Sequence, residues 1–501
     1  MNRIYISLIF ALTLFTYPRA HAQTSWAVGT SGDWSMAGNW SAGVPDIAAA
    51  VLITNAGSKT VTVDPVTPVL NRAARRMDLY APTGSTNTLS LVNLGASPFM
   101  MSNSFTLNPG SRLQLTNSII LLDGGAGGAF NQFAGDIIVA GGGLVTTNGA
   151  SLRIGRSGLG QVTMTAGELM SYADFVIGGL PGGTGQLTIS GGMARTEGTL
   201  YLGDDPGAVG AVFLTGGTLI ATNPVNTSRI GDDGTGTLTI QAGTAWFDSV
   251  SVGRGSGAVG RLNVRGGSLN SRSLSFGRFL GSTGTLEVSG GQVDMLDSTL
   301  YVGREGTGTA LLSNGVVNAQ AVLVSATPTA TGSLQLHGGT LNTLTFTATN
   351  AAGTIQFNAG QLNITQSTLV SNGAPFVVGD GVRAAFLQLD GATNIFADGL
   401  VIAANATLRG AGNVTGTITV LPGGSNQLGA APPVVLNATR SGAQLVLQFA
   451  SVLGQTYDIQ SATNVTGAVW QTEATLPGTG GTLAHTNAMT GTRRFYRLFI
   501  H

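Results

Sequence analysis

Short runs of alternating apolar and polar residues recur along most of the chain, and one or two glycines close nearly every run. In the segment "GTLEVSGG", Leu286 and Val288 fall on one side of an extended chain and Glu287 falls on the other. Alternation of this kind over about four to eight residues is typical of a half-buried β-strand. A helical interpretation fails because glycine interrupts the runs before about ten residues. The pattern therefore predicts many short strands joined by tight turns.

The runs belong to a frame that returns about every 24 residues. The glycine that closes the second strand stands at Gly142, Gly167, Gly192, Gly217, Gly243, Gly267, Gly291, Gly315, Gly339 and Gly360. A second glycine keeps a matching period at Gly155, Gly178, Gly203, Gly231, Gly253, Gly277 and Gly303. One turn cannot bury its apolar residues, whereas stacked turns can, since each strand then pairs with its equivalent ~4.8 Å above and below. We therefore predict an all-β fold whose main body is a parallel β-helix, or β-solenoid, with Val252, Phe276 and Val302 one above the next.

The two ends of the chain depart from this frame. Residues 23–64 contain three of the five Trp residues and match the frame poorly, so we expect them to cap the first rung of the repeats at 65–428. Residues 429–501 hold five alternating strands, which predict a small antiparallel β-sandwich. Residues 1–22 combine a basic start, an apolar run and the small residues "AHA", which predict a cleaved signal peptide and therefore export.

The composition narrows the classes of function. Lys and Arg number 23 and Asp and Glu also 23, so the neutral chain lacks the basic surface that nucleic-acid binding needs. No cysteine is present, which excludes disulfides and thiolate zinc sites. No second apolar run is long enough to span a membrane after signal cleavage. The 43% of hydrophobic residues suffices for a buried core.

Several segments carry a family resemblance. "GTGTLTIQAG", "STGTLEVSGG" and "ATGSLQLHGG" resemble the autotransporter-associated β-helix repeats of large secreted bacterial proteins, and residues 398–424 resemble the segment that often closes such arrays. The opening looks similar too, with Trp26, Trp34, Asn39, Trp40 and Pro45 at matching places. The resemblance covers roughly residues 24 to 425 and implies a β-helix on or outside the cell surface, with no defined catalytic residues. We expect no translocator barrel, and hence Sec-dependent export followed by another route.

The C-terminal segment has a separate resemblance. It is similar to the short β domain, ending in an "FYRL"-type strand, that many secreted proteins of environmental bacteria carry. By analogy with those proteins, this segment would serve in cell-envelope retention or sorting.

The residue after the second glycine of each repeat is the main candidate for a binding site. Along the stack this position holds Arg156, Gly179, Asp204, Asp232, Arg254, Arg278 and Arg304. In register, these residues form a column at one corner, with Asp232 beside Arg254 as an exposed ion pair and Arg254, Arg278 and Arg304 as a cationic ladder. Solvated polar turns would produce the same pattern. Stacked guanidinium groups, however, can bind the carboxylates or sulfates of an acidic polysaccharide.

The two "GDD" turns raise two further interpretations. Asp204, Asp205, Asp232 and Asp233 could hold Ca²⁺ together with loop carbonyls, although the nonapeptide calcium repeat is absent and we otherwise expect no cofactor. The same carboxyls could serve a glycosidase or lyase, which requires two of them roughly 5–10 Å apart. Tight turns without long loops provide no walls for a cleft. None of the four His residues belongs to a recognisable Ser/His/Asp catalytic set in the sequence.

These observations favour an exported, non-enzymatic β-helix protein that acts outside the cell in adhesion, matrix building or glycan contact. Its partners would be polysaccharides or cell-envelope components, held by weak contacts that repeat on flat polar faces. Two alternatives stay open: a polysaccharide-degrading β-helix enzyme and a passive structural spacer.

Overall fold

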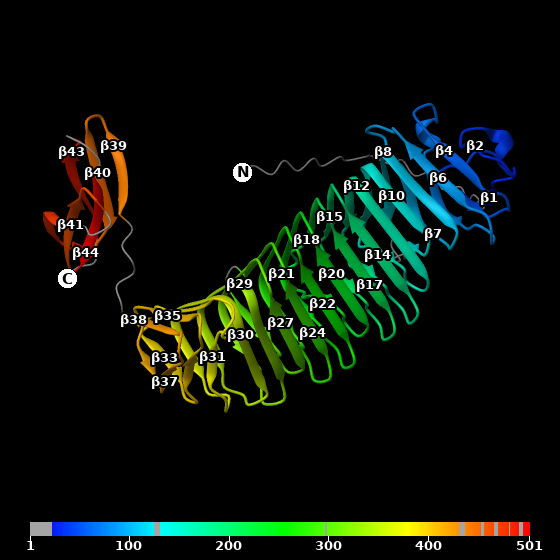
Figure 1. Cartoon of the computed structure of the whole chain (residues 1–501). Coiled ribbons are helices and arrows are strands. Elements are labelled where there is room, and N and C mark those ends of the chain that lie inside the picture. Colours follow the sequence, from blue (N-terminus) through cyan, green and yellow to red (C-terminus); the bar gives the residue numbers. More distant parts are fainter. Residues whose placement is uncertain are drawn as a thin grey trace.

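A computed structural model describes residues 23–124, 131–295, 298–429, 436–451, 455–464, 469–479, 481–489 and 494–500. The signal peptide predicted for residues 1–22 lies outside these residues. The strands from β1 (Gln23–Ser25) to β38 (Ser425–Leu428) stack as a parallel β-solenoid of about 16 turns (Figure 1). The predicted fold class and the period of about 24 residues are confirmed. Among the described residues, no helix is long and apolar enough to cross a membrane.

Three strands make up a regular turn, as in β24 (Thr283–Val288), β25 (Gln292–Met295) and β26 (Thr299–Val302). We call the sides of the rod that contain these strands face 1, face 2 and face 3. In the preceding turn they pair, all in parallel, with β22 (Val259–Val264) and β23 (Ser268–Phe276), and in the following turn with β27 (Thr307–Leu312) and β28 (Val316–Val324). Each face is therefore a ladder of equivalent strands.

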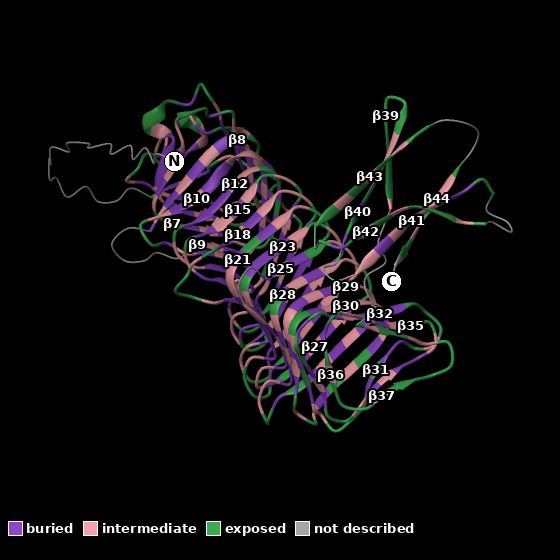
Figure 2. Ribbon diagram, turned by 90° about the vertical axis from the view of Figure 1, so that its left-hand side faces the viewer, coloured by how far each residue is buried: buried purple, intermediate pink, exposed green. Residues whose placement is uncertain are grey.

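The core is a pile of aliphatic and aromatic side chains along the axis of the rod. Val252 pairs in register with Phe276, and Phe276 with Val302. All three side chains are fully buried, so the predicted stacking is confirmed. Buried and partly exposed positions alternate along the strands, as the period of two requires (Figure 2).

Glycine shapes the corner that follows face 3. Gly253 has φ +68°, in the left-handed region that other residues rarely adopt. A Cβ atom at this position would lie 2.0 Å from the carbonyl oxygen of Thr283 in the next turn. The corner therefore needs glycine both for its backbone conformation and for the close approach between turns.

An aromatic cluster lies at the N-terminal end of the rod. Trp40 packs edge-on against both Trp26 and Trp34, at centroid distances of 5.0 and 4.8 Å. The indole N–H of Trp34 donates to the carbonyl of Asn71, and that of Trp40 donates to the carbonyl of Trp34, both at 2.7 Å. All three rings are almost fully buried, so they cover the apolar end of the stack.

The C-terminal residues form two antiparallel sheets with their own core. One sheet contains β39 (Asn437–Ser441), β40 (Gln444–Ala450) and β43 (Thr482–Ala488); the other contains β41 (Thr456–Ala462), β42 (Gln471–Pro477) and β44 (Phe495–Ile500). Leu447, Phe449, Tyr457 and Ile459 are buried between them. The five predicted strands are present. The additional strand β39 is exposed along its whole length and therefore lacks an apolar alternation.

Candidate functional site

The corner column predicted from the sequence is present, and backbone hydrogen bonds hold it together. The N–H of Asp232 donates to the carbonyl of Gly203 at 3.1 Å, and that of Arg254 donates to Gly231 at 2.9 Å. The N–H groups of Arg278 and Arg304 donate in the same way to Gly253 and Gly277, at 2.9 and 3.1 Å. Each residue after the corner glycine is thus fixed one turn above its equivalent.

Asp232 sits between two guanidinium groups. Its Oδ2 accepts a hydrogen bond from Nη1 of Arg229 at 2.6 Å, and its Oδ1 accepts one from Nη1 of Arg254 at 3.0 Å. The Asp232 side chain is only 5% exposed, so the expectation of an exposed ion pair with Arg254 is wrong. The carboxylate is buried because arginines from its own turn and from the next turn cover both of its oxygens. Arg229, on the strand β19 (Ser228–Ile230), is a member of the site that the sequence pattern did not identify.

Arg278 and Arg304 have a different environment. Nη1 of Arg278 donates to Oγ of the buried Ser251 at 3.0 Å, and its guanidinium lies 5.3 Å from the centroid of the Phe279 ring. The guanidinium of Arg304 lies 5.0 Å from the Tyr301 ring. Within the described part of the chain, neither arginine has a carboxylate within 4.0 Å. The aromatic rings therefore hold two guanidinium groups whose charges are not neutralised by an ion pair.

Burial and the neighbouring arginines both affect the charge state of Arg278. The pKa of Arg278 is lowered from its usual value, first by burial and then by the charges of Arg304 and Arg254. A lowered pKa means that the surroundings disfavour the charged form of Arg278, and a bound anion would offset the part of this effect that comes from the neighbouring arginines. We name Arg254, Arg278 and Arg304 the arginine corner.

The carboxyl of Asp204 lies one turn before Asp232. Burial, followed by the negative charges of Asp232 and Asp205, raises its pKa from 3.8 to about 6. Between pH 3.8 and 6 the folded protein keeps a proton that the unfolded chain releases, so this group lowers stability as the pH rises through that window.

Replacing Asp204 by Asn is expected to stabilise the protein at pH 7.5, by about 1 kcal/mol, because the remaining exposure of the carboxyl screens part of the effect. The gain should vanish at pH values below 3.8, where the carboxyl is protonated in both states. Thermal unfolding monitored by circular dichroism at pH 3.5 and pH 7.5 measures it. Asp233→Asn, at an exposed position, is the control and should change neither curve. A gain that is equal at both pH values would contradict the assignment.

The four aspartates do not assemble as a metal site would require. Asp205 is half-buried and Asp233 is exposed, while both oxygens of Asp232 are held by arginines. Over the residues that the structure describes, no three His, Cys, Asp or Glu side chains lie close enough together to hold a metal ion. At this corner two arginines hold Asp232, whereas Arg278 and Arg304 on the following turns have no described carboxylate within 4.0 Å.

The chain was compared with family models, curated proteins and solved structures, and none of the three comparisons found a match.

Proposed function

We propose that this β-solenoid protein is an exported, non-catalytic rod that acts outside the bacterial cell by holding acidic polysaccharides at the arginine corner. The observation that carries the proposal is the stacking of Arg254, Arg278 and Arg304 on successive turns, with Asp232 as the carboxylate within salt-bridge distance of Arg254. The autotransporter-associated resemblance of the repeats and the secretion-type N-terminal sequence support an extracellular location.

The chemistry of the corner favours carboxylates and sulfates. A guanidinium group presents its N–H donors in a planar fork that matches the two oxygens of such anions. Phe279 and Tyr301 hold the guanidinium groups in place, which reduces the entropy that is lost when an anion binds.

The repetition of the site favours a polymer as the ligand. Equivalent arginines on neighbouring turns lie ~4.8 Å apart, so charged groups along one polysaccharide chain can each meet a different turn. Contacts of this kind are weak one at a time and strong together. The same geometry argues against catalysis, because a glycosidase needs two carboxyls that are free to meet a sugar and Asp232 is held by two arginines.

Replacing Arg278 and Arg304 together by Ser is expected to weaken the binding of polygalacturonate at least tenfold, as measured by biolayer interferometry. The matched control is Arg261→Ser with Arg265→Ser, which removes the same charge from two exposed positions, one within β22 and one directly after it. The control should bind within about twofold of the unsubstituted protein. Equal losses in the two variants would assign binding to net charge, and an unsubstituted protein that binds no acidic polysaccharide would overturn the proposal.

A further inference from the structure

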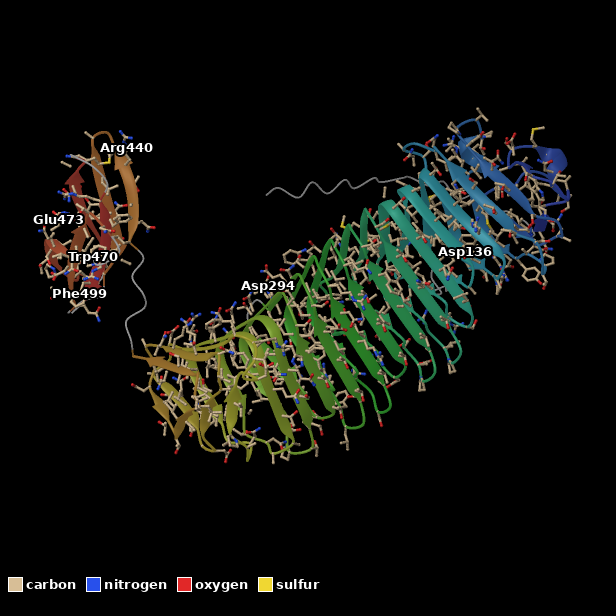
Figure 3. All side chains as sticks on the ribbon, in the orientation of Figure 1. Asp136, Asp294, Arg440, Trp470, Glu473 and Phe499 are labelled. Carbon is tan, nitrogen blue, oxygen red and sulfur yellow. The ribbon has the colours of Figure 1, made fainter. Side chains whose placement is uncertain are left out.

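Face 2 carries a column of outward side chains that differs from the arginine corner in position and in chemistry. Its members pair in register from turn to turn and lie at the same place on each strand. In order along the rod they are Asn270, Asp294, Asn318, Asn342, Asn363 and Gln388. We call them the amide column; Asp294 is labelled in Figure 3.

Four members of the column, from Asp294 to Asn363, are joined by hydrogen bonds that run in one direction. Nδ2 of Asn318 donates to Oδ1 of Asp294 at 2.7 Å, and Nδ2 of Asn342 donates to Oδ1 of Asn318 at 2.7 Å. Nδ2 of Asn363 continues the chain to Oδ1 of Asn342 at 2.6 Å. A primary amide has two N–H donors and two acceptor lone pairs. The central amides of Asn318 and Asn342 each use one N–H donor and one lone pair in this chain of hydrogen bonds. Each therefore keeps one N–H donor and one lone pair for a ligand.

A cavity of about 540 Å³ lies over the column. Its polar lining includes Asn318, Gln320, Asn342, Asn363, Gln388 and Asp390. This volume is within the usual range for pockets that bind small molecules. The hollow crosses at least four turns of the rod, so an occupant would lie along the axis and meet one amide of the column in each turn.

The residues of the cavity select for a neutral ligand rich in hydroxyl groups. The lining contains no Lys or Arg, and its one charged residue is Asp390. A polyanion would therefore find no counter-charge there. A hydroxyl both donates and accepts a hydrogen bond, which matches the free N–H and free lone pair that each central amide presents.

An aromatic side chain lies on face 2 one turn before Asn270, the first member of the amide column. Trp246 pairs in register with Asn270, and its side chain is 41% exposed on face 2. An exposed indole presents a flat apolar surface with a polar edge, which suits the apolar face of a sugar ring. A glycan that runs along the axis beyond the cavity would meet this ring after leaving the amides.

Asp294 and Asp390, the described carboxylates at the two ends of the hollow, are too far apart to act together in hydrolysis of such a glycan. Asp294 lies four turns from Gln388, and Asp390 follows Gln388 by two residues. Four turns correspond to ~19 Å, whereas glycosidases place their two carboxyls within ~10 Å of each other. This separation favours binding over cleavage at the hollow.

We propose that the amide column is a second binding site, which holds a neutral glycan extended along the axis of the rod. It does not depend on the arginine corner, because it lies on another face and recognises hydroxyl groups instead of anions. A protein with both sites would join a neutral and an acidic polysaccharide.

The test uses the purified protein and a printed panel of neutral hexasaccharides, including cellohexaose and xylohexaose. We expect at least one of them to bind, and Asn342→Ala to weaken that binding at least tenfold. The control is Gln335→Ala, which removes an outward amide from face 1 in the same turn and should leave the affinity unchanged. Asn342→Asp keeps the size of the side chain while removing its N–H donors, and it should also lose binding even if Asn342→Ala fails to fold.

The outcomes separate the two sites. The Arg278→Ser, Arg304→Ser protein should bind the neutral glycan normally, and Asn342→Ala should bind polygalacturonate normally. The proposal is overturned if no neutral hexasaccharide binds, or if Gln335→Ala loses as much affinity as Asn342→Ala. It is also overturned if an extended peptide binds the amide column more tightly than the glycan and displaces it.

Discussion

Gly253→Ala is expected to lower the free energy of unfolding of the rod by about 3 kcal/mol or more, for two additive reasons. At φ +68° the new residue is forced into the left-handed region, which costs roughly 1–2 kcal/mol for an L-residue. Its Cβ would also stand 2.0 Å from the carbonyl oxygen of Thr283, which belongs to the backbone of the next turn and cannot rotate away. The turns would have to separate at this corner, which would weaken the pairing of β21 (Thr244–Val252) with β23.

Gly257→Ala is the matched control for this variant. Gly257 has a similar φ of +83°, but a Cβ atom there would meet nothing within 4 Å. Its cost should be the backbone strain alone, roughly 1–2 kcal/mol. Chemical denaturation followed by circular dichroism compares the two. Equal losses would show that the turns are not packed at Gly253 as described.

Most of the fold could be predicted because its determinants are local and periodic. The glycine spacing fixes the length of the turn, and the alternation around Phe276 and Val302 fixes which side chains point inward. The strand β39 was missed because all five of its residues are exposed, so no apolar alternation marks it. Pairing with β40 by backbone hydrogen bonds, which sequence periodicity does not report, makes it a strand.

The chemistry of the outer faces was predictable only in part. The column that contains Arg254 and Asp232 follows from the register, but the burial of Asp232 depends on where the long side chain of Arg229 folds. The amide column was missed although a signal exists: Asp294, Asn318 and Asn342 each follow a repeat glycine by three residues. Its cavity could not have been predicted, because its shape depends on how side chains such as Gln320 and Gln388 fill the outer surface.

The second large effect that we expect is that the affinity of the arginine corner for acidic oligosaccharides rises with their length. If acidic polysaccharides bind across successive turns, a galacturonate monomer meets one guanidinium group, whereas a longer chain meets Arg254, Arg278 and Arg304 together. Arg254 and Arg304 are two turns apart, which is ~10 Å. Joining several weak contacts in one ligand raises affinity by roughly a hundredfold or more without any new interaction. The gain should level off once the oligomer spans this distance.

Isothermal titration of the purified protein with oligogalacturonates of increasing length is therefore the most direct test of the claim that the rod binds polymers through its repeated corner. A steep rise of affinity that levels off near the span of the three arginines, and that disappears in the Arg278→Ser, Arg304→Ser protein, is the predicted result. An affinity per carboxylate that is the same for the monomer and for the longest oligomer would contradict it.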